Sequence, residues 1–238
     1  PDNQVDSGFY TLNISGDGAD APYYAGMVGE WHMDECSWDG TTGEVADTSG
    51  TGAHGESHNM DAGDTVDRSV GKVCYAAALN LDGRTDQYVT LGHEAFNNLG
   101  DFSLSLWFRV ESLSSSITTI FSGARSGAYN SMLIYLNSSG TSLYTWVNDS
   151  QTGVFNIGAS VADGLWHHLV WTRRASDGAE IVYLDGTALS DTNGTVNTAT
   201  VTLDPGGAIL GQEQDALGGG FDVNRVFHGW IDEVMIYN

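Results

Sequence analysis

Basic residues are scarce in this 238-residue sequence, where eight Lys and Arg stand against 31 Asp and Glu, for a formal net charge of −23. Lys72 is the only lysine. Proteins bind nucleic-acid backbones and anionic membrane surfaces through clusters of Lys and Arg. This chain has too few basic residues to form such a cluster. The composition therefore excludes nucleic acid as a partner and favours cations, or neutral ligands held through them.

Long apolar runs are also missing, since no stretch approaches the length of a membrane span, and we expect no direct membrane insertion. Only three prolines and 16% charged residues argue against a disordered tail or a coiled coil. With 41% hydrophobic residues, the chain is long enough for one β-sandwich domain. It begins at Pro1 without an initiator Met or a signal peptide, so we interpret it as an excised fragment.

The sequence has only two cysteines, Cys36 and Cys74, and neither belongs to a Cys-x-x-Cys motif. A zinc site or a redox site is therefore weakly supported. An even count in a glycine-rich chain of extracellular character predicts a disulfide between them. Two buried free thiols are the alternative.

Alternation of apolar and polar residues dominates the second half of the chain. In 102–110 every second residue is apolar, which predicts a strand buried on one side. No segment combines a helical period with caps, and turn residues separate the apolar runs. Further strands are predicted at 117–121, 132–136, 143–147, 167–173, 180–184, 208–210 and 229–237. Many short strands separated by turns predict an all-β sandwich or barrel.

The first part of the chain is less regular. Residues 1–26 carry Gly, Asp, Ala and Pro punctuation, and we interpret them as a linker or a docked arm preceding a domain at 27–238. Residues 36–80 are rich in Gly, Asp, Ser and Thr and are expected to form long loops.

A cluster of oxygen-bearing residues follows the strand predicted at 208–210. Glu213-Gln214-Asp215 comes first, and Asp222 follows three consecutive glycines. Calcium is bound by six to eight oxygens from carboxylates, amides and carbonyls on a loop that folds around the ion. The pattern therefore indicates a calcium loop, with an ordinary solvated acidic loop as the alternative in so acidic a chain.

The run Ile209-Leu-Gly-Gln-Glu-Gln-Asp215, followed by Gly-Gly, resembles the calcium loop of the pentraxins. These proteins are two-sheet antiparallel jelly-roll sandwiches of the laminin-G-like and concanavalin-A-like superfamily. Segments 164–171, 182–186 and 227–237 resemble other strands of the family, so that the resemblance spans roughly residues 27–238. It implies a jelly-roll fold and a calcium-binding function.

The resemblance also implies specific calcium ligands. Asp222 matches a carboxylate of the family's second calcium site, but Arg225 falls where that site has a glutamine, and a cation cannot ligate calcium. One calcium ion is therefore expected, and the second site is in doubt, together with the phosphocholine binding it supports in pentraxins. The first site would comprise Asp86, Gln87, Glu213, the backbone carbonyl of Gln214, and Asp215.

The cysteine pair and segment 30–40 resemble bacterial laminin-G-like modules instead. Such modules occur in large surface proteins, including those of mannose-sensitive haemagglutinin pilus biogenesis. This resemblance implies a secreted or cell-surface protein that acts in adhesion.

Four aromatic residues are candidates for stacking on sugar rings. Trp107, Tyr144 and Trp146 lie on the polar faces of their predicted strands, and Trp38 lies in a loop. The alternative is that loops cover these rings and that they pack as a second layer of the core.

Catalytic patterns are weak. The sequence has no Gly-x-Ser-x-Gly elbow, and the acidic run at 30–35 lacks the Glu-x-Asp-x-x-Glu spacing of jelly-roll glycosidases. We therefore expect a calcium-dependent module that binds a glycan or another cell-surface ligand, not an enzyme. The alternatives are a catalytic or ancillary domain of a polysaccharide-degrading enzyme, and a calcium-stabilised spacer in an adhesin. The sequence predicts no oligomeric state.

Overall fold

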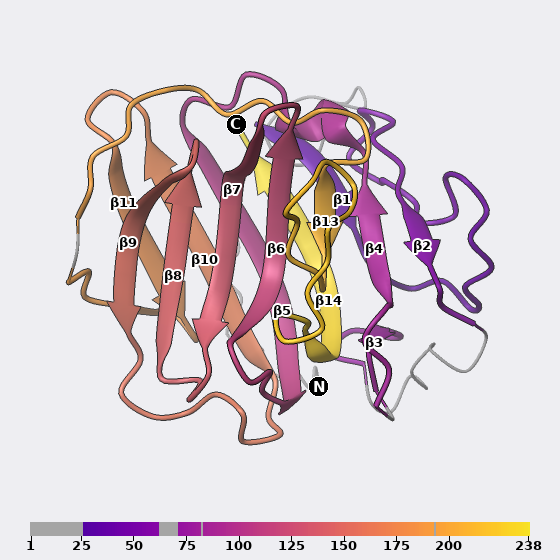
Figure 1. The fold of residues 1–238 in the computed structure, drawn as a ribbon. Coiled ribbons are helices and arrows are strands. Elements are labelled where there is room, and N and C mark those ends of the chain that lie inside the picture. The colour runs from indigo at the N-terminus through magenta and orange to yellow at the C-terminus, as the bar shows by residue number, and fades with distance from the viewer. Residues whose placement is uncertain (1–25, 62–70, 82, 193) are drawn as a thin grey trace, which may run out of the picture.

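The computed structural model describes residues 26–61, 71–81, 83–192 and 194–238. Two seven-stranded antiparallel sheets pack face to face, as expected for a jelly-roll sandwich (Figure 1). The first sheet has the order β1–β14–β5–β10–β11–β12, with β3 also pairing with β14, and the second has the order β2–β4–β13–β6–β7–β8–β9. The predicted fold class is confirmed.

The first sheet comprises β1 (Met27–Trp31), β3 (Ala77–Leu79), β5 (Phe102–Ser112), β10 (His167–Arg174), β11 (Ala179–Leu184), β12 (Thr187–Ala188) and β14 (His228–Tyr237). The second comprises β2 (Glu56–His58), β4 (Tyr88–Leu91), β6 (Ile117–Arg125), β7 (Ala128–Asn137), β8 (Ser142–Val147), β9 (Ser150–Asn156) and β13 (Ala208–Leu210). A short 3-10 helix, η2 (His93–Phe96), follows β4.

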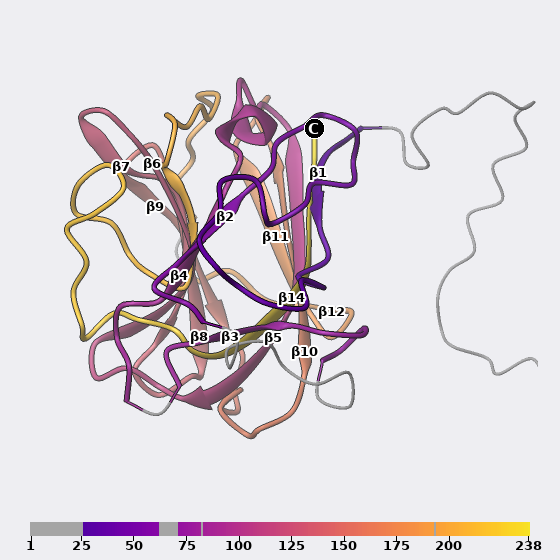
Figure 2. The same cartoon turned by 90° about the vertical axis from the view of Figure 1, so that its right-hand side faces the viewer.

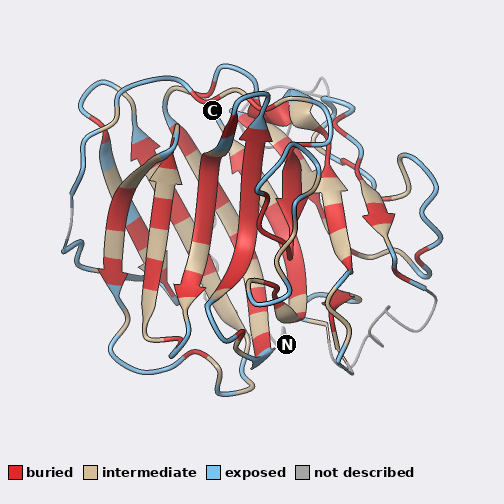
Figure 3. Cartoon of the chain, in the orientation of Figure 1, coloured by how far each residue is buried: buried red, intermediate tan, exposed pale blue. Residues whose placement is uncertain are grey.

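The core lies between the two sheets. Along β5 the buried residues alternate with half-buried ones, as the period of two predicts, and Leu104 and Phe108 point into the core. Trp171 from the first sheet and Phe121 from the second are completely buried in the same cluster. Figure 3 shows this alternation as bands across the strands. Burial of apolar surface at about 25 cal/mol per Å² is the main force that holds the sheets together.

The described ends of the chain meet at one edge of the sandwich. β1 pairs with β14, and the amide of Asn238 donates to the carbonyl of Gly26 at 2.8 Å. Strands in the described residues begin at Met27. Of the predicted linker or docked arm at 1–26, all but Gly26 lies outside the described residues. No helix in the described ranges is long and apolar enough to span a membrane.

The predicted disulfide is wrong in this structure, because Cys36 and Cys74 are both free and exposed. Both neighbours of Cys74 have other attachments: the amide of Tyr75 donates to Asp34, and the amide of Val73 donates to Asp232. Backbone hydrogen bonds to carboxylates therefore hold the segment at residue 74, which needs no cystine to keep its place.

Candidate functional site

The segment between β13 and β14, residues 211–227, lies on the outer face of the second sheet. It passes in front of β13 and β6 in Figure 1, and Figure 2 shows it standing out from that face. Gly211 begins it with a φ of +91°, which favours glycine. We call this segment the β13–β14 loop.

Gln214 attaches the loop to the sheet. Its side-chain amide donates to the carbonyls of Ser122 and Gly207 at 3.0 Å each, and its side-chain oxygen accepts from the amide of Gly218 at 2.9 Å. The side chain is therefore used by the fold, and the backbone carbonyl of Gln214 stays a predicted metal ligand.

Gln212 joins the loop to the segment that precedes β4. Its side-chain amide donates to the carbonyls of Thr85, at 2.9 Å, and Gln87, at 3.3 Å. The segment that carries Asp86 and the beginning of the loop, which carries Glu213, therefore lie side by side. The side-chain oxygen of Gln212 is buried and accepts no hydrogen bond.

An arginine is the centre of the acidic cluster in the loop. Nη1 of Arg225 lies 2.8 Å from Oε2 of Glu213 and 3.6 Å from Oδ2 of Asp215, and its Nε lies 3.6 Å from Oδ2 of Asp222. Burial raises the pKa of Glu213, and its bond to Arg225 opposes that rise. The same bond raises the pKa of Arg225. The three carboxylates thus share one guanidinium.

These contacts decide how well calcium fits. Among the residues that the structure describes, no three His, Cys, Asp or Glu side chains form a group able to hold a metal ion. The second predicted site does not fit, because Arg225 contacts Asp222, the carboxylate predicted for it.

For the first site the donor chemistry fits in part. The side chains of Asp86 and Asp215 are 62% and 60% exposed, although each lies near an arginine: Asp86 is 3.7 Å from Arg84 and Asp215 is 3.6 Å from Arg225. The Gln212 oxygen is an unused buried acceptor nearby in the chain. The side-chain oxygen of Gln87 is different, because it accepts from the amide of Asn80 at 2.7 Å. Gln87 thus orders the segment, and an ion would be held by Asp86, the Gln214 carbonyl and those oxygens of Glu213 and Asp215 that do not contact Arg225.

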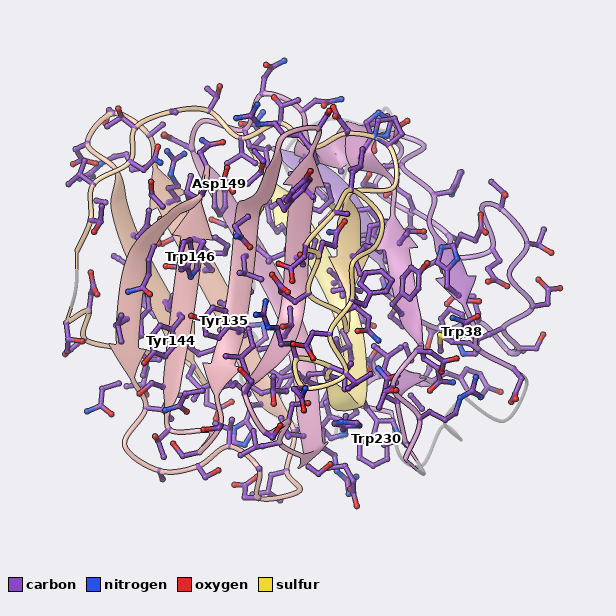
Figure 4. All side chains as sticks on the ribbon, in the orientation of Figure 1. Trp38, Tyr135, Tyr144, Trp146, Asp149 and Trp230 are labelled. Carbon is purple, nitrogen blue, oxygen red and sulfur yellow. The ribbon has the colours of Figure 1, made fainter. Side chains whose placement is uncertain are left out.

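Three aromatic residues form a strip on the same face, beside the loop. Tyr135 on β7 and Tyr144 on β8 stack with ring centroids 5.0 Å apart, and Trp146 lies further along β8 (Figure 4). All three are half-buried. We call Tyr135, Tyr144 and Trp146 the aromatic strip.

The strip is continuous with the ion cluster. Burial raises the pKa of Tyr135, and Trp146, Arg225 and Glu213 are near enough to its hydroxyl to act on that pKa as well. The sequence analysis proposed Tyr144 and Trp146 and missed Tyr135, whose position on the outer face follows from its cross-strand pairing with Tyr144.

The other two aromatic predictions are not supported. Trp38 is only 2% exposed and packs in the main core, so the prediction that it contacts a ligand is wrong. Trp107 does lie on the outer face of the first sheet, but Nζ of Lys72 sits 4.0 Å from its ring centroid and the His168 ring lies at 4.7 Å. It belongs to the covered second layer that was the alternative interpretation.

On the other side of the loop lies a pocket of about 400 Å³, lined by His54, His58, His93 and Glu56 among others. The ring of Tyr88 stacks on His58 and contacts Phe221 of the loop at 4.8 Å. Burial lowers the pKa of His58. The loop therefore has an aromatic strip on one side and a polar pocket on the other.

A family model matches the part of the chain that carries this arrangement. Residues 82–238, which include the loop and the strip, match the concanavalin A-like lectin/glucanases superfamily. The chain belongs to this superfamily. Pentraxins are among its relatives: neuronal pentraxin-2 of Mus musculus is 33% identical over 138 residues, and C-reactive protein 1.4 of Limulus polyphemus is 30% identical over 142 residues.

The matches cover 58% and 59% of this chain, but only 30% of neuronal pentraxin-2 and 57% of the Limulus protein. Among solved structures, domain 4 of AbnA, an extracellular arabinanase from Geobacillus stearothermophilus, was determined in complex with arabinotriose. It is similar to this chain with a TM-score of 0.57 and 22% identity, over 90% of this chain and 93% of that domain. This likeness shows the shared fold.

Proposed function

We propose that the chain is a non-catalytic carbohydrate-binding module of a secreted or cell-surface protein, and that it holds its ligand on the outer face of the second sheet. The aromatic strip beside the β13–β14 loop carries this proposal. Half-exposed aromatic rings on a rigid sheet present flat apolar surface to a sugar ring at little cost in conformational entropy. The neighbouring carboxylates and Arg225 supply hydrogen-bond partners for hydroxyl groups.

Two comparisons support the choice of a saccharide. The family model groups lectins with glucanases, and the arabinanase domain of the same fold binds arabinotriose. We propose that one calcium ion, held by Asp86, Glu213, Asp215 and the backbone carbonyl of Gln214, orders the loop against the segment before β4. An adhesive role in a bacterial surface protein is the biological setting that fits such a module.

A glycan array, followed by calorimetry with the best oligosaccharide in calcium and in chelator, tests the proposal. Trp146→Ala should weaken binding by about 10- to 100-fold, which corresponds to roughly 1.5–3 kcal/mol of buried aromatic surface. Trp230→Ala is the matched control, since Trp230 is a half-buried tryptophan of the first sheet that stacks against Arg109. Equal losses in the two variants, or no binding by the wild type, would contradict the proposal.

One observation favours a second candidate, a polysaccharide-active enzyme. Glu213 is a buried carboxyl with a raised pKa, Asp215 shares its arginine, and Glu213 lies near Tyr135 of the aromatic strip. A general acid next to a second carboxylate is the arrangement that glycoside hydrolysis requires. Release of reducing ends from a bound polysaccharide, lost in Glu213→Gln, would establish this activity, and stable binding without products would support the binding module.

A further inference from the structure

The β13–β14 loop contains its own cation. Glu213, Asp215, Asp222 and Arg225 all belong to this loop, and the guanidinium lies within 3.6 Å of each of the three carboxylates. Two of the contacts use Nη1 and the third uses Nε. A single side chain thereby links the beginning of the loop, at Glu213, to its end.

Burial makes this partner necessary. The side chain of Glu213 is only 4% exposed, whereas that of Arg225 is 33% exposed. A buried carboxylate without a charged partner is strongly destabilising, and a guanidinium satisfies it with directed hydrogen bonds. Glu213 therefore depends on Arg225, while the more exposed Asp215 and Asp222 can also be solvated by water.

The backbone holds Arg225 in place. Its amide donates to the carbonyl of Asp222 at 2.9 Å, and its carbonyl accepts from the amide of Thr119 on β6 at 3.3 Å. Two residues further on, the amide of Phe227 donates to the carbonyl of Gly211 at 2.9 Å. The guanidinium thus extends from an anchored position, not from a free loop tip.

We infer that Arg225 acts as a permanent substitute for a metal ion at this end of the loop. A divalent cation cannot take the place of the guanidinium while Arg225 is present, because the two repel each other and compete for the same oxygens, Oε2 of Glu213 and Oδ2 of Asp215 and Asp222. With Arg225 in place the loop is closed without a metal there. Without it, three negative charges remain on a loop of hard oxygen ligands, and the cluster becomes a site for a divalent cation.

This inference does not depend on the proposed glycan. Its test compares the number of calcium ions bound by the wild type and by a variant of Arg225, so it can be made whether or not the calcium ion proposed at Asp86 binds. Arg225→Gln removes the positive charge and places an amide oxygen among the three carboxylates. The probe is calcium chloride, added by calorimetric titration to protein freed of metal with a chelator.

We expect Arg225→Gln to bind one more calcium ion per chain than the wild type. In chelator its melting temperature should lie below that of the wild type, and calcium should restore most of the loss. Hydrogen exchange of the Gly218 and Phe227 amides, which are bonded within the loop, should show the same dependence. Arg174→Gln is the control, since it removes an exposed arginine that pairs with Asp177 on the β10–β11 turn, and it should gain no ion.

Equal ion counts in Arg225→Gln and the wild type, or equal melting temperatures in chelator, would overturn the inference. If Arg225→Gln folds only in calcium, the inference is supported. If it folds in neither condition, Arg225→Lys decides the question: this variant keeps the charge and should bind the wild-type number of ions, and an additional ion there would overturn the inference.

Discussion

The rings of Tyr135 and Tyr144 lie parallel on neighbouring strands, with an interplanar angle of 3°. The two residues are directly opposite each other in the β7–β8 ladder, so the sheet itself fixes this geometry. A pair of parallel rings held by backbone hydrogen bonds is a rigid surface, which loses little entropy when a sugar ring stacks on it.

The first prediction concerns this pair. Tyr144→Ala should weaken oligosaccharide binding about tenfold, the equivalent of ~1.4 kcal/mol, because it removes the ring and loosens its partner. Tyr144→Phe keeps the ring and should bind within about twofold of the wild type. Calorimetry measures both constants, and a loss of similar size in the two variants would assign the contact to the hydroxyl group instead.

The second prediction concerns calcium at the segment before β4. Asp86→Asn should abolish the rise in melting temperature that calcium gives the wild type, because it removes a charged ligand of the proposed ion. At a calcium concentration of about 100 times Kd, that stabilisation amounts to ~2.7 kcal/mol. Glu111→Gln, at the exposed end of β5, is the control and should respond like the wild type. If the melting temperature of Asp86→Asn still rises with calcium, the ion binds at other residues and the prediction is wrong.

The third prediction is a pH dependence of stability near the β1–β14 edge. The bond between Nδ1 of His32 and Oε2 of Glu233, at 2.8 Å, raises the His32 pKa from 6.5 to about 9. Since the folded pKa lies above the unfolded one, the stabilisation is complete below pH 6.5 and is lost as the pH rises through 9. His32→Gln should flatten the melting-temperature profile between these values, whereas His93→Gln should leave it unchanged. Parallel profiles for His32→Gln and the wild type would contradict the assignment.

The fourth prediction concerns Asp232, where burial raises the pKa from 3.8 to about 7. Its Oδ2 accepts from the amides of Lys72 and Val73, while its Oδ1 is buried without a partner. Stability should therefore fall as the pH rises from 3.8 through 7, because ionisation of a buried carboxyl is unfavourable.

Asp232→Asn keeps an accepting oxygen and cannot ionise. At pH 8 it should be more stable than the wild type by roughly 1–4 kcal/mol, the upper end being the full shift at about 1.36 kcal/mol per pKa unit. Urea unfolding at pH 5 and pH 8 measures the effect. A variant less stable than the wild type at pH 8 would show that the amide disrupts the two backbone hydrogen bonds.

Much of the fold could be predicted from the sequence, because apolar and polar residues alternate along a strand that is buried on one face. The alternation in 102–110 predicted β5, and the apolar run at 208–210 coincides with β13. The strands in the irregular region 36–80 were not predicted, since β2 and β3 have only three residues each and their partner strands are distant in sequence. Strands that short carry too little pattern to be distinguished from loops.

The candidate site was predictable only in part, for the same physical reason. The sequence identified the acidic residues of the loop and the position of Arg225, but not that the guanidinium would contact all three carboxylates, which depends on how the loop folds back. Trp38 was misjudged because it lies in a loop, and only tertiary packing places its ring in the core. Tyr135 was missed because an outward residue in an apolar strand looks like a core residue until its neighbour is known.

The two ends of the β13–β14 loop are joined by the bond between the amide of Phe227 and the carbonyl of Gly211. The strands on either side therefore depend little on the tip of the loop at 215–220, in contrast to the anchoring residues Gln212, Gln214 and Arg225. Mutation could replace this tip, insert into it or exchange it with that of a homologue, at small risk to the core. In evolutionary terms the loop is a unit of variation, through which new binding specificities can arise on an unchanged scaffold.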